Sequence, residues 1–445
     1  EKMLYDNAQL LHLLAEAWLI APRPLWKQTA ERLVEWLTRE MTSSEGTFFA
    51  AQDADSEGEE GKFFVWTPAE IRTALGNDAD AELICQYFDV TPAGNFEESS
   101  SSVLSVSDAR IGDARIEALR VKLFEARRKR IAPGLDDKVL AGWNGLTIRG
   151  LAMAATAFER DDWAQLAARA AEAFATGTLK RTPVSSIGQS APSAMSRANA
   201  ASIAQSAPSA VSPANAPAGE GWGEGVTQPL TAMLEDYGDL ISGLVALFQR
   251  TQDARWLARA EELADTAYDT FWDAQKSAWR AAPKDASDLV VTPYAVHDNA
   301  FPSGASTLTE AQVALTALTG RPRHLERARI YLERMREEAL RNPLGFGHLL
   351  IAADLLVDGS AELTLIADPE RLTAWRTRLA KYWLPTLSVV AHARGARAPA
   401  VLDELLAQRG GSGAFLCQHF SCRLPVESDE ALEKLVAPFG INPSG

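Results

Sequence analysis

The chain has 445 residues, 47% of them hydrophobic and 23% charged, which is the composition of an ordinary globular protein with a sizeable core. Its 59 acidic and 44 basic residues give a formal net charge of −15, which argues against nucleic-acid binding because such binding depends on Lys and Arg. No apolar run reaches the roughly 18 residues of a membrane helix, and three cysteines are too few for a disulfide framework, so we expect a cytoplasmic protein.

The first part of the chain is predicted to form two helices and two short strands. Apolar residues at helical spacing predict helices over 3–20 and 25–41, separated by two prolines. Two short aromatic runs, 47–50 and 63–66, are typical of strands. Between them lies the acidic segment AAQDADSEGEEG, 51–62, which we interpret as an exposed hairpin tip, or alternatively as a calcium loop.

Helices continue on both sides of one unusual segment. We expect helices at about 68–76, 79–88 and 112–131, followed by a helical pair over 138–180. The segment 181–229 is rich in Ser, Ala, Pro and Gly, and within it IGQSAPSAMSRANA recurs as IAQSAPSAVSPANA. Such a composition cannot bury enough apolar surface to offset its ordering entropy, so a disordered insertion is predicted there.

Two more helical pairs are predicted at 231–274 and 303–341, and a further apolar helix at about 345–357. The pattern then changes to short buried strands alternating with helices. The strands are expected at 362–367 and 387–391, and the helices at 369–382, 398–408 and 428–437. We therefore expect one large helical domain over 1–360 and a small α/β appendage over 361–445.

Four of the helical pairs share one internal spacing. The first helix opens with a polar or aromatic cluster, and 19 to 21 residues later a bulky ring opens the second helix. The ring residues are Trp26, Trp163, Trp256 and His324. Repetition of this kind marks stacked units that share one core, so the sequence predicts a mainly α array of helical hairpins.

Six motifs in one order carry a family resemblance. They are EKMLYDNAQLL, AAQDADSEGEEGKFFVWT, DDKVLAGWNGLTIRGLA, LEDYGDLISGLVALF, DNAFPSG and AFLCQHFSCRLPV. Together they resemble the bacterial and animal thioredoxin-domain family typified by spermatogenesis-associated protein 20. The resemblance implies an (α/α)6 toroid, similar to six-hairpin glycosidases and N-acylglucosamine 2-epimerases, that follows a thioredoxin-like domain. It also implies that this chain is N-terminally truncated, lacking that domain and the first hairpin, so the domain is an expected partner in the full-length protein.

The sequence differs from the usual residues of the family at polar positions of the toroid. Ala305 follows PSG where the family usually has Asn, and residues around Tyr294 replace a common Arg-x-Lys. These departures leave open that this copy is inactive.

In a toroid of this kind the N-terminal ends of the inner helices converge on one face. The helix openings would then form a funnel of carboxylates, amides and aromatic rings, which suit sugar hydroxyls and C–H faces. The expected substrate-binding residues are Tyr5, Asn7, Trp143, Asn144, Tyr237, Asp298 and Ser303. The alternative is that the polar ones only cap helices, because Asp, Asn and Ser are preferred N-caps.

Candidate catalytic residues come from three places. Asp6 and Asp236 stand at helix openings, and Asp53 and Asp55 lie two apart in the acidic segment, where they could face the funnel. One protonated and one ionised carboxyl would serve general acid/base chemistry. His348, at the start of an inner helix, would be the proton-shuttling base by analogy with toroidal epimerases.

The last two cysteines, Cys417 and Cys422, have four residues between them, which fits neither a thioredoxin-type redox pair nor a zinc site, so we expect buried thiols. No metal or cofactor is predicted. The sequence thus favours a protein that binds or modifies a carbohydrate, as an epimerase, isomerase or glycoside hydrolase. The alternatives are a non-catalytic scaffold serving the thioredoxin-like domain, or an inactive truncated copy.

Overall fold

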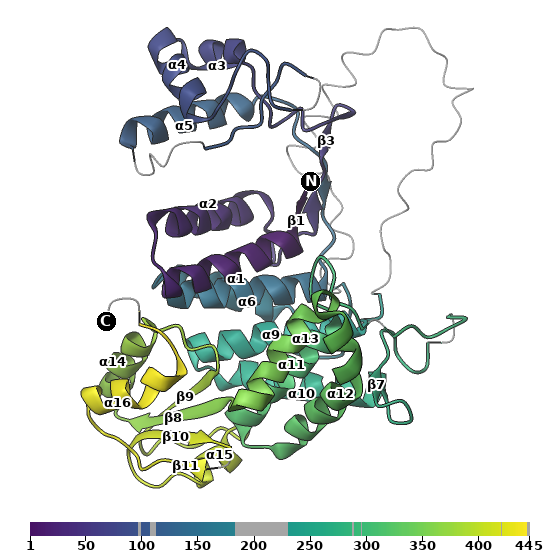
Figure 1. The fold of residues 1–445 in the computed structure, drawn as a ribbon, viewed down its shortest axis with the longest axis vertical. Helices are drawn as coiled ribbons and strands as arrows, with labels where there is room; N and C mark the ends of the chain where they lie inside the picture. The colour runs from purple at the N-terminus through teal and green to yellow at the C-terminus, as the bar shows by residue number, and fades with distance from the viewer. Residues whose placement is uncertain are drawn as a thin grey trace. The chain divides into compact units, whose positions relative to one another are not determined.

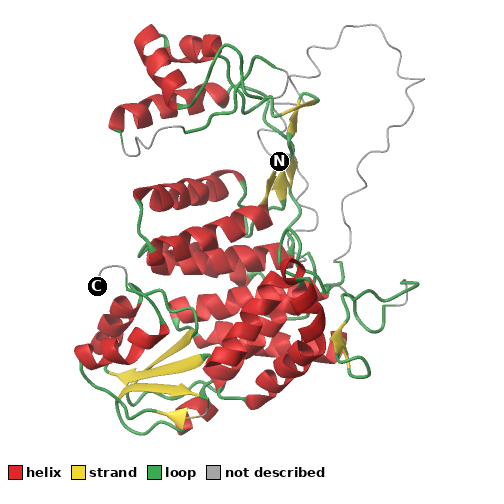
Figure 2. Ribbon diagram, viewed as in Figure 1, coloured by secondary structure: helices red, strands yellow, loops and turns green. Residues whose placement is uncertain are grey.

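The computed structural model describes residues 1–96, 99–106, 113–182, 230–286, 289–294, 296–419 and 421–442. The predicted disordered insertion lies outside the described residues except at its first two positions. The protein is mainly α, as predicted, with one substantial sheet near the C-terminus (Figure 2). Among the described residues, no helix is both long and apolar enough to cross a membrane.

The chain forms two compact units. Glu1–Met3 and Ala51–Asp137 belong to unit 1, whereas Leu4–Ala50 and the described residues from Lys138 onward belong to unit 2. This division differs from the expected one. Residues 51–137 were expected in the helical domain but belong to unit 1. The C-terminal α/β part was expected to be a domain of its own but belongs to the same unit as the hairpins.

Unit 1 combines short strands with a small helical core. The strands are β1 (Lys2–Met3), β2 (Ala51–Gln52) and β5 (Leu135–Asp136), which form an antiparallel sheet in the order β1-β2-β5, and β3 (Asp55–Ser56) and β4 (Glu59–Glu60), which form a hairpin. The helices are α3 (Pro68–Leu75), α4 (Asp78–Tyr87) and α5 (Ala114–Arg127). Thr67 and Glu70 form a capping box that begins α3, and Gly76 ends it in the left-handed conformation. The predicted acidic loop thus contains strands of its own.

Unit 2 is built from the repeated helical hairpins (Figure 1). The helices are α1 (Leu4–Ile20), α2 (Pro24–Glu40), α6 (Ala141–Ala157), α7 (Asp161–Glu172), α9 (Leu234–Thr251), α10 (Ala254–Phe271), α11 (Gly304–Thr319), α12 (Pro322–Arg341) and α13 (Gly347–Asp354). The inner helices α1, α6, α9, α11 and α13 pack in succession, and α2, α7, α10 and α12 each cover the inner helix that precedes them. This is the predicted α/α toroid arrangement. The ring residues that open α7, α10 and α12 are buried.

Glycines let neighbouring inner helices approach each other closely. A Cβ on Gly145 of α6 would lie 2.5 Å from backbone atoms of Leu240 in α9, and one on Gly243 would lie 2.3 Å from the carbonyl oxygen of Gly145. No side chain fits at either position without moving a backbone. The spacing of glycines in GWNG and LISG therefore reflects helix contact.

The C-terminal part of unit 2 is a four-stranded sheet of order β11-β10-β8-β9, in which only β8 and β9 are parallel. Its elements are β8 (Ala361–Ala367), α14 (Pro369–Leu379), β9 (Leu387–Ala393), α15 (Asp403–Ala407), β10 (Gly413–Gln418), β11 (Ser421–Cys422) and α16 (Asp429–Val436). Gln249 and Gln252, at the end of α9, accept hydrogen bonds from the backbone N–H groups of Val389 and Ala391 in β9. The edge of the sheet is thus held by the helices.

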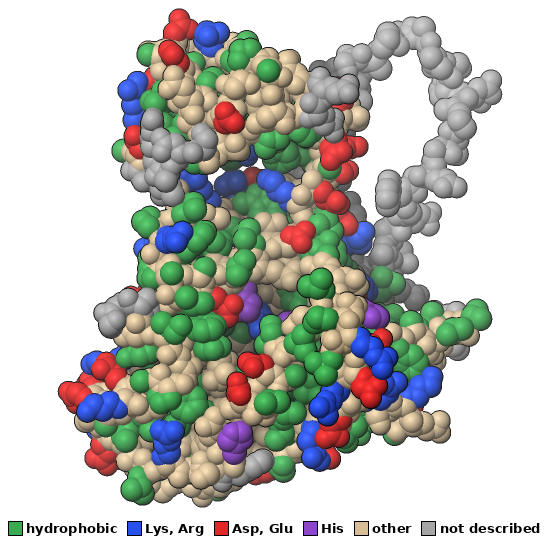
Figure 3. Space-filling model, in the orientation of Figure 1, with side chains coloured by type: hydrophobic (Ala, Val, Ile, Leu, Met, Phe, Trp, Pro, Cys, Tyr) green, Lys and Arg blue, Asp and Glu red, His purple; other side chains and the backbone are tan. Residues whose placement is uncertain are grey.

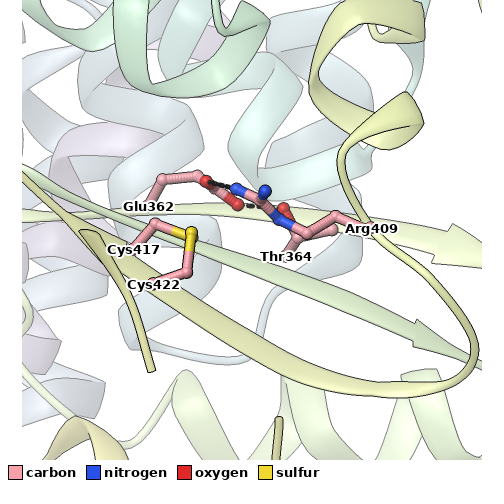
Figure 4. Close-up of a disulfide and its surroundings, with 5 residues drawn as sticks. All are labelled: Glu362, Thr364, Arg409, Cys417 and Cys422. Atoms are coloured by element: carbon pink, nitrogen blue, oxygen red, sulfur yellow. Dashed lines mark hydrogen bonds and ion pairs between the residues drawn. A yellow bond between two sulfur atoms is a disulfide. The ribbon is translucent and has the colours of Figure 1, made fainter. Parts of the chain in front are cut away.

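Cys417 and Cys422 form a disulfide in the β10–β11 hairpin (Figure 4). The expectation of buried thiols is therefore wrong. That expectation treated the segment as one continuous strand, whereas the chain turns at His419, which has a positive φ of 50°, and places the two cysteines opposite each other. Beside them, Glu362 of β8 pairs with Arg409 and accepts a hydrogen bond from Thr364.

Candidate functional site

Unit 2 contains a cavity of about 900 Å³ among its inner helices. All five inner helices contribute to its wall, and α14 and the segment 382–389 complete it. Figure 3 shows a hollow in this part of the molecule, where acidic, basic and His side chains gather among hydrophobic ones. In α1, α6, α9 and α11 the helical residues that line the cavity lie after the first turn, whereas in α13 His348 of the first turn lines it.

A largely buried ion-pair cluster, with side chains 13–16% exposed, occupies the cavity wall. The Arg149 guanidinium donates two hydrogen bonds to the Glu310 carboxylate, at 2.7 and 2.9 Å, and a third to the Ser242 hydroxyl at 2.8 Å. Nε2 of His348 lies 2.8 Å from Oε2 of Glu310. Arg149, Glu310 and His348 come from three different inner helices, α6, α11 and α13. Glu310 is therefore the centre of a network that ties these helices together.

The cluster fixes the charge of Glu310. Burial alone would raise the pKa of this carboxyl, but Arg149 and His348 together hold it well below its usual range. Glu310 is consequently an ionised acceptor, and the hydrogen on Nε2 of His348 points to it. Nδ1 is then the nitrogen of His348 that remains for proton exchange.

His12 of α1 lines the same cavity. Burial, reinforced by the positive charge of Arg149, lowers the pKa of its imidazole to about 3. Its Nε2 lies 3.8 Å from Oε1 of Glu16, and the side chain keeps 23% of its exposure. At neutral pH His12 is therefore an uncharged base that water or a ligand in the cavity can reach.

The buried polar residues of the predicted funnel bond to backbone groups near the helix openings. Asn144 is fully buried and exchanges hydrogen bonds with the backbone N–H and carbonyl of Phe48. Asp236 accepts from the backbone N–H of Met233 and of Gly142, and it pairs with Arg181. The Asp236 contacts satisfy backbone N–H groups at the starts of α6 and α9, and the Asn144 contacts hold the loop after α2 against α6.

Asp298 and Ser303 act in the same way at the next two inner helices. Asp298 accepts hydrogen bonds from the backbone N–H of Ser303 at 2.9 Å and of His348 at 2.8 Å. The Ser303 hydroxyl accepts from the backbone N–H of Ser306 as the N-cap of α11. Asp298 thus positions the start of α13, where His348 stands.

The predicted aromatic residues pack on other rings. Tyr5 lies 4.8 Å from Trp143 and 5.0 Å from Phe301 between ring centroids, and Tyr237 packs against Phe271 at 5.3 Å. Asp6 is exposed on the first turn of α1, and Asn7 is half-buried. None of these predicted residues lines the cavity.

Asp53 and Asp55 belong to unit 1 and are exposed. Asp55 stands in β3, and its backbone N–H points to Oδ1 of Asp53 at 3.4 Å. No group of three or more His, Cys, Asp or Glu suited to a metal ion exists among the described residues.

His348 is thus the one predicted site residue on the cavity wall, and the sequence analysis missed His12, Arg149 and Glu310. A signal for them was available. Charged side chains are rarely buried without a partner, and Arg149 and Glu310 each interrupt an otherwise apolar or hydroxyl-bearing helix, in GLTIRGLA and TLTEAQV. An ion pair between two such residues on different inner helices could have been predicted from the sequence.

No family model matches this sequence. The chain is similar to spermatogenesis-associated protein 20 of Homo sapiens, 25% identical over 98% of this chain and 58% of that protein. It is 26% identical to the Rattus norvegicus protein of the same name, over 83% of this chain and 48% of that protein. The chain therefore spans about half the length of the curated relatives that it matches.

Two solved structures with a similar chain path are the following. The GH76 α-mannanase of Bacteroides thetaiotaomicron superposes with a TM-score of 0.44 at 11% identity, covering 85% of this chain and 73% of that one. A D-mannose isomerase gives a TM-score of 0.35 at 13% identity, covering 76% of each chain.

Proposed function

We propose that the cavity of unit 2 binds a sugar and rearranges it by proton transfer, as an epimerase or isomerase does. The observation that carries this proposal is that two imidazoles, His12 and His348, face one cavity in different electrostatic settings. A proton acceptor and a proton donor that face one substrate are what general acid/base catalysis requires.

The roles follow from the charges around each ring. His12 is neutral and accepts the proton from the carbon next to the sugar carbonyl, and the electron pair of that C–H bond moves toward the carbonyl oxygen. His348 enters this step with both ring nitrogens protonated, its Nε2–H held by the ionised Glu310, and gives its Nδ1 proton to that oxygen. Arg149 keeps Glu310 ionised. The reverse transfers then give the rearranged sugar.

Hydrolysis of a glycoside fits the cavity less well. It would require a protonated carboxyl beside a free carboxylate, whereas Glu310 is ionised and already accepts hydrogen bonds from Arg149 and His348. A purely structural toroid is the second candidate. It is favoured by the capping contacts at the helix openings, and the open cavity deeper in the unit argues against it.

The test is exchange of solvent deuterium into sugars. A panel of aldoses, ketoses, N-acetylhexosamines and their phosphates, including D-mannose, is incubated with the protein in D2O and analysed by mass spectrometry and NMR. We expect deuterium at the carbon next to the carbonyl, and a loss of about 100-fold or more in rate for His12→Gln and for His348→Gln. His297→Gln, a half-exposed histidine outside the cavity, is the matched control. Absence of exchange with every sugar, or equal rates in His12→Gln, contradicts the proposal.

A further inference from the structure

The disulfide hairpin of unit 2 has one accessible and one protected sulfur. Cys422 is exposed in β11, a two-residue strand at the outer edge of the sheet, whereas Cys417 is 8% exposed in β10. An incoming thiolate must approach the sulfur–sulfur bond in line, so Cys422 is the sulfur that a partner can attack.

The disulfide contributes little to the stability of the hairpin. Only four residues separate the two cysteines, and the stabilisation from closing a loop grows with the length of that loop. The hairpin is also held without it, because the cysteines are cross-strand neighbours in a sheet that continues through β8 and β9. The hairpin can therefore keep its place when the bond is open.

A buried cation stands on the same face of the sheet as the disulfide. Cys417 is directly opposite Glu362 in the β10–β8 register, so both side chains lie on one face. Arg409 covers that face, pairs with Glu362 at 2.5 Å and is 5% exposed (Figure 4). Its Nε–H is buried and has no hydrogen-bond partner among the described residues. A thiolate formed at Cys417 would lie beside the Glu362–Arg409 ion pair, in which the guanidinium offsets the charge of the carboxylate.

From these three observations we propose that Cys417 and Cys422 form a reversible thiol–disulfide exchange site for a protein dithiol, with Cys422 as the sulfur attacked. The partner's thiolate bonds to Sγ of Cys422, the Cys417–Cys422 bond breaks, and Cys417 leaves with the electron pair as a thiolate beside the Glu362–Arg409 pair. The partner's second thiol then attacks the mixed disulfide and releases Cys422. Two electrons and two protons pass to the cysteine pair, and the partner dithiol becomes a disulfide.

The test uses the full chain with Cys85→Ser, so that the exchange site is the only source of thiols. A thioredoxin-class protein whose second active-site cysteine is replaced by Ser is mixed with the oxidised chain, and the adduct is mapped by mass spectrometry. We expect a covalent adduct on Cys422, at least about tenfold more abundant than on Cys417. The unmodified thioredoxin-class dithiol should reduce the pair completely in the native protein, as counted by alkylation.

Two variants test the local chemistry. Arg409→Gln should slow the exchange several-fold, whereas Arg423→Gln, which removes an exposed cation next to Cys422, should slow it less. Melting temperatures show whether each variant is folded, and only folded variants are compared. The proposal is overturned if the pair opens only under denaturing conditions, if the adduct forms on Cys417, or if glutathione reduces the pair as fast as the protein dithiol at equal thiol concentration.

Discussion

His12 shows how the cavity changes the chemistry of a single residue. An exposed imidazole has a pKa near 6.5, and burial beside Arg149 lowers that of His12 to about 3. Between these two values the unfolded chain binds a proton at this position and the folded chain does not. Folding stability must therefore fall as pH decreases from about 6.5 toward 3.

This linkage gives a prediction at the residue scale. His12→Gln should lose less folding stability between pH 7 and pH 4 than the wild type, by about 1–3 kcal/mol, because water in the cavity reduces the full effect of the shift. Urea unfolding at four pH values measures it. The unfolding free energy of His297→Gln, a surface variant, should depend on pH as that of the wild type does. If the wild type and His12→Gln show the same pH dependence, His12 does not lose its proton on folding.

Residues of the site were predictable only in part. His348 stood out because it follows a turn and opens a helix, which places it near the axis of a toroid. Arg149 and Glu310 lie 161 residues apart, and nothing in the sequence shows that they meet. The sequence could not decide the role of the residues at the helix openings, since Asp, Asn and Ser at a helix start serve capping and ligand binding equally well.

At the scale of elements, the glycines of the inner helices set how closely α6 and α9 pack. Gly145→Ala should destabilise the protein by about 1–3 kcal/mol, because the added methyl meets the backbone of Leu240, and the better helix propensity of Ala offsets only part of that cost. Gly347→Ala in α13 is the control. Its Cβ would meet no atom within 4 Å, so the melting temperature should be unchanged or slightly higher. Equal effects at both sites would show that the close approach is not rigid.

Element boundaries followed from local rules where those rules were strong. The prolines and apolar spacing that predicted a helix over 25–41 correspond to α2, Pro24–Glu40, and the pair predicted at 303–341 corresponds to α11 and α12. The hairpin at the two cysteines was missed because its turn is made by His419 with a positive φ, without Gly, Asn or Asp to mark it. A turn without such residues leaves no signal in the sequence.

At the scale of the whole molecule, the repeat spacing predicted the hairpins of unit 2 but not the separation of unit 1. The helices of unit 1 are short and outside the repeat, yet they bury an apolar core of their own around Trp66, Ile84 and Leu119. Sequence patterns report which face of a helix is apolar, and they do not report which other element covers it. The division into units depends on which element covers each apolar face.

Unit 1 buries a hydrophobic cluster of its own, which implies that the chain does not unfold as one cooperative block. Calorimetry should resolve two transitions. Ile84→Ala, in the core of unit 1, should lower one of them by several degrees, and Leu244→Ala, in α9 of unit 2, should lower the other, because each change removes a fully buried side chain at a cost of about 2–5 kcal/mol. Each variant serves as the control for the other. A single transition that both substitutions displace alike would mean that the two cores are coupled into one folding unit.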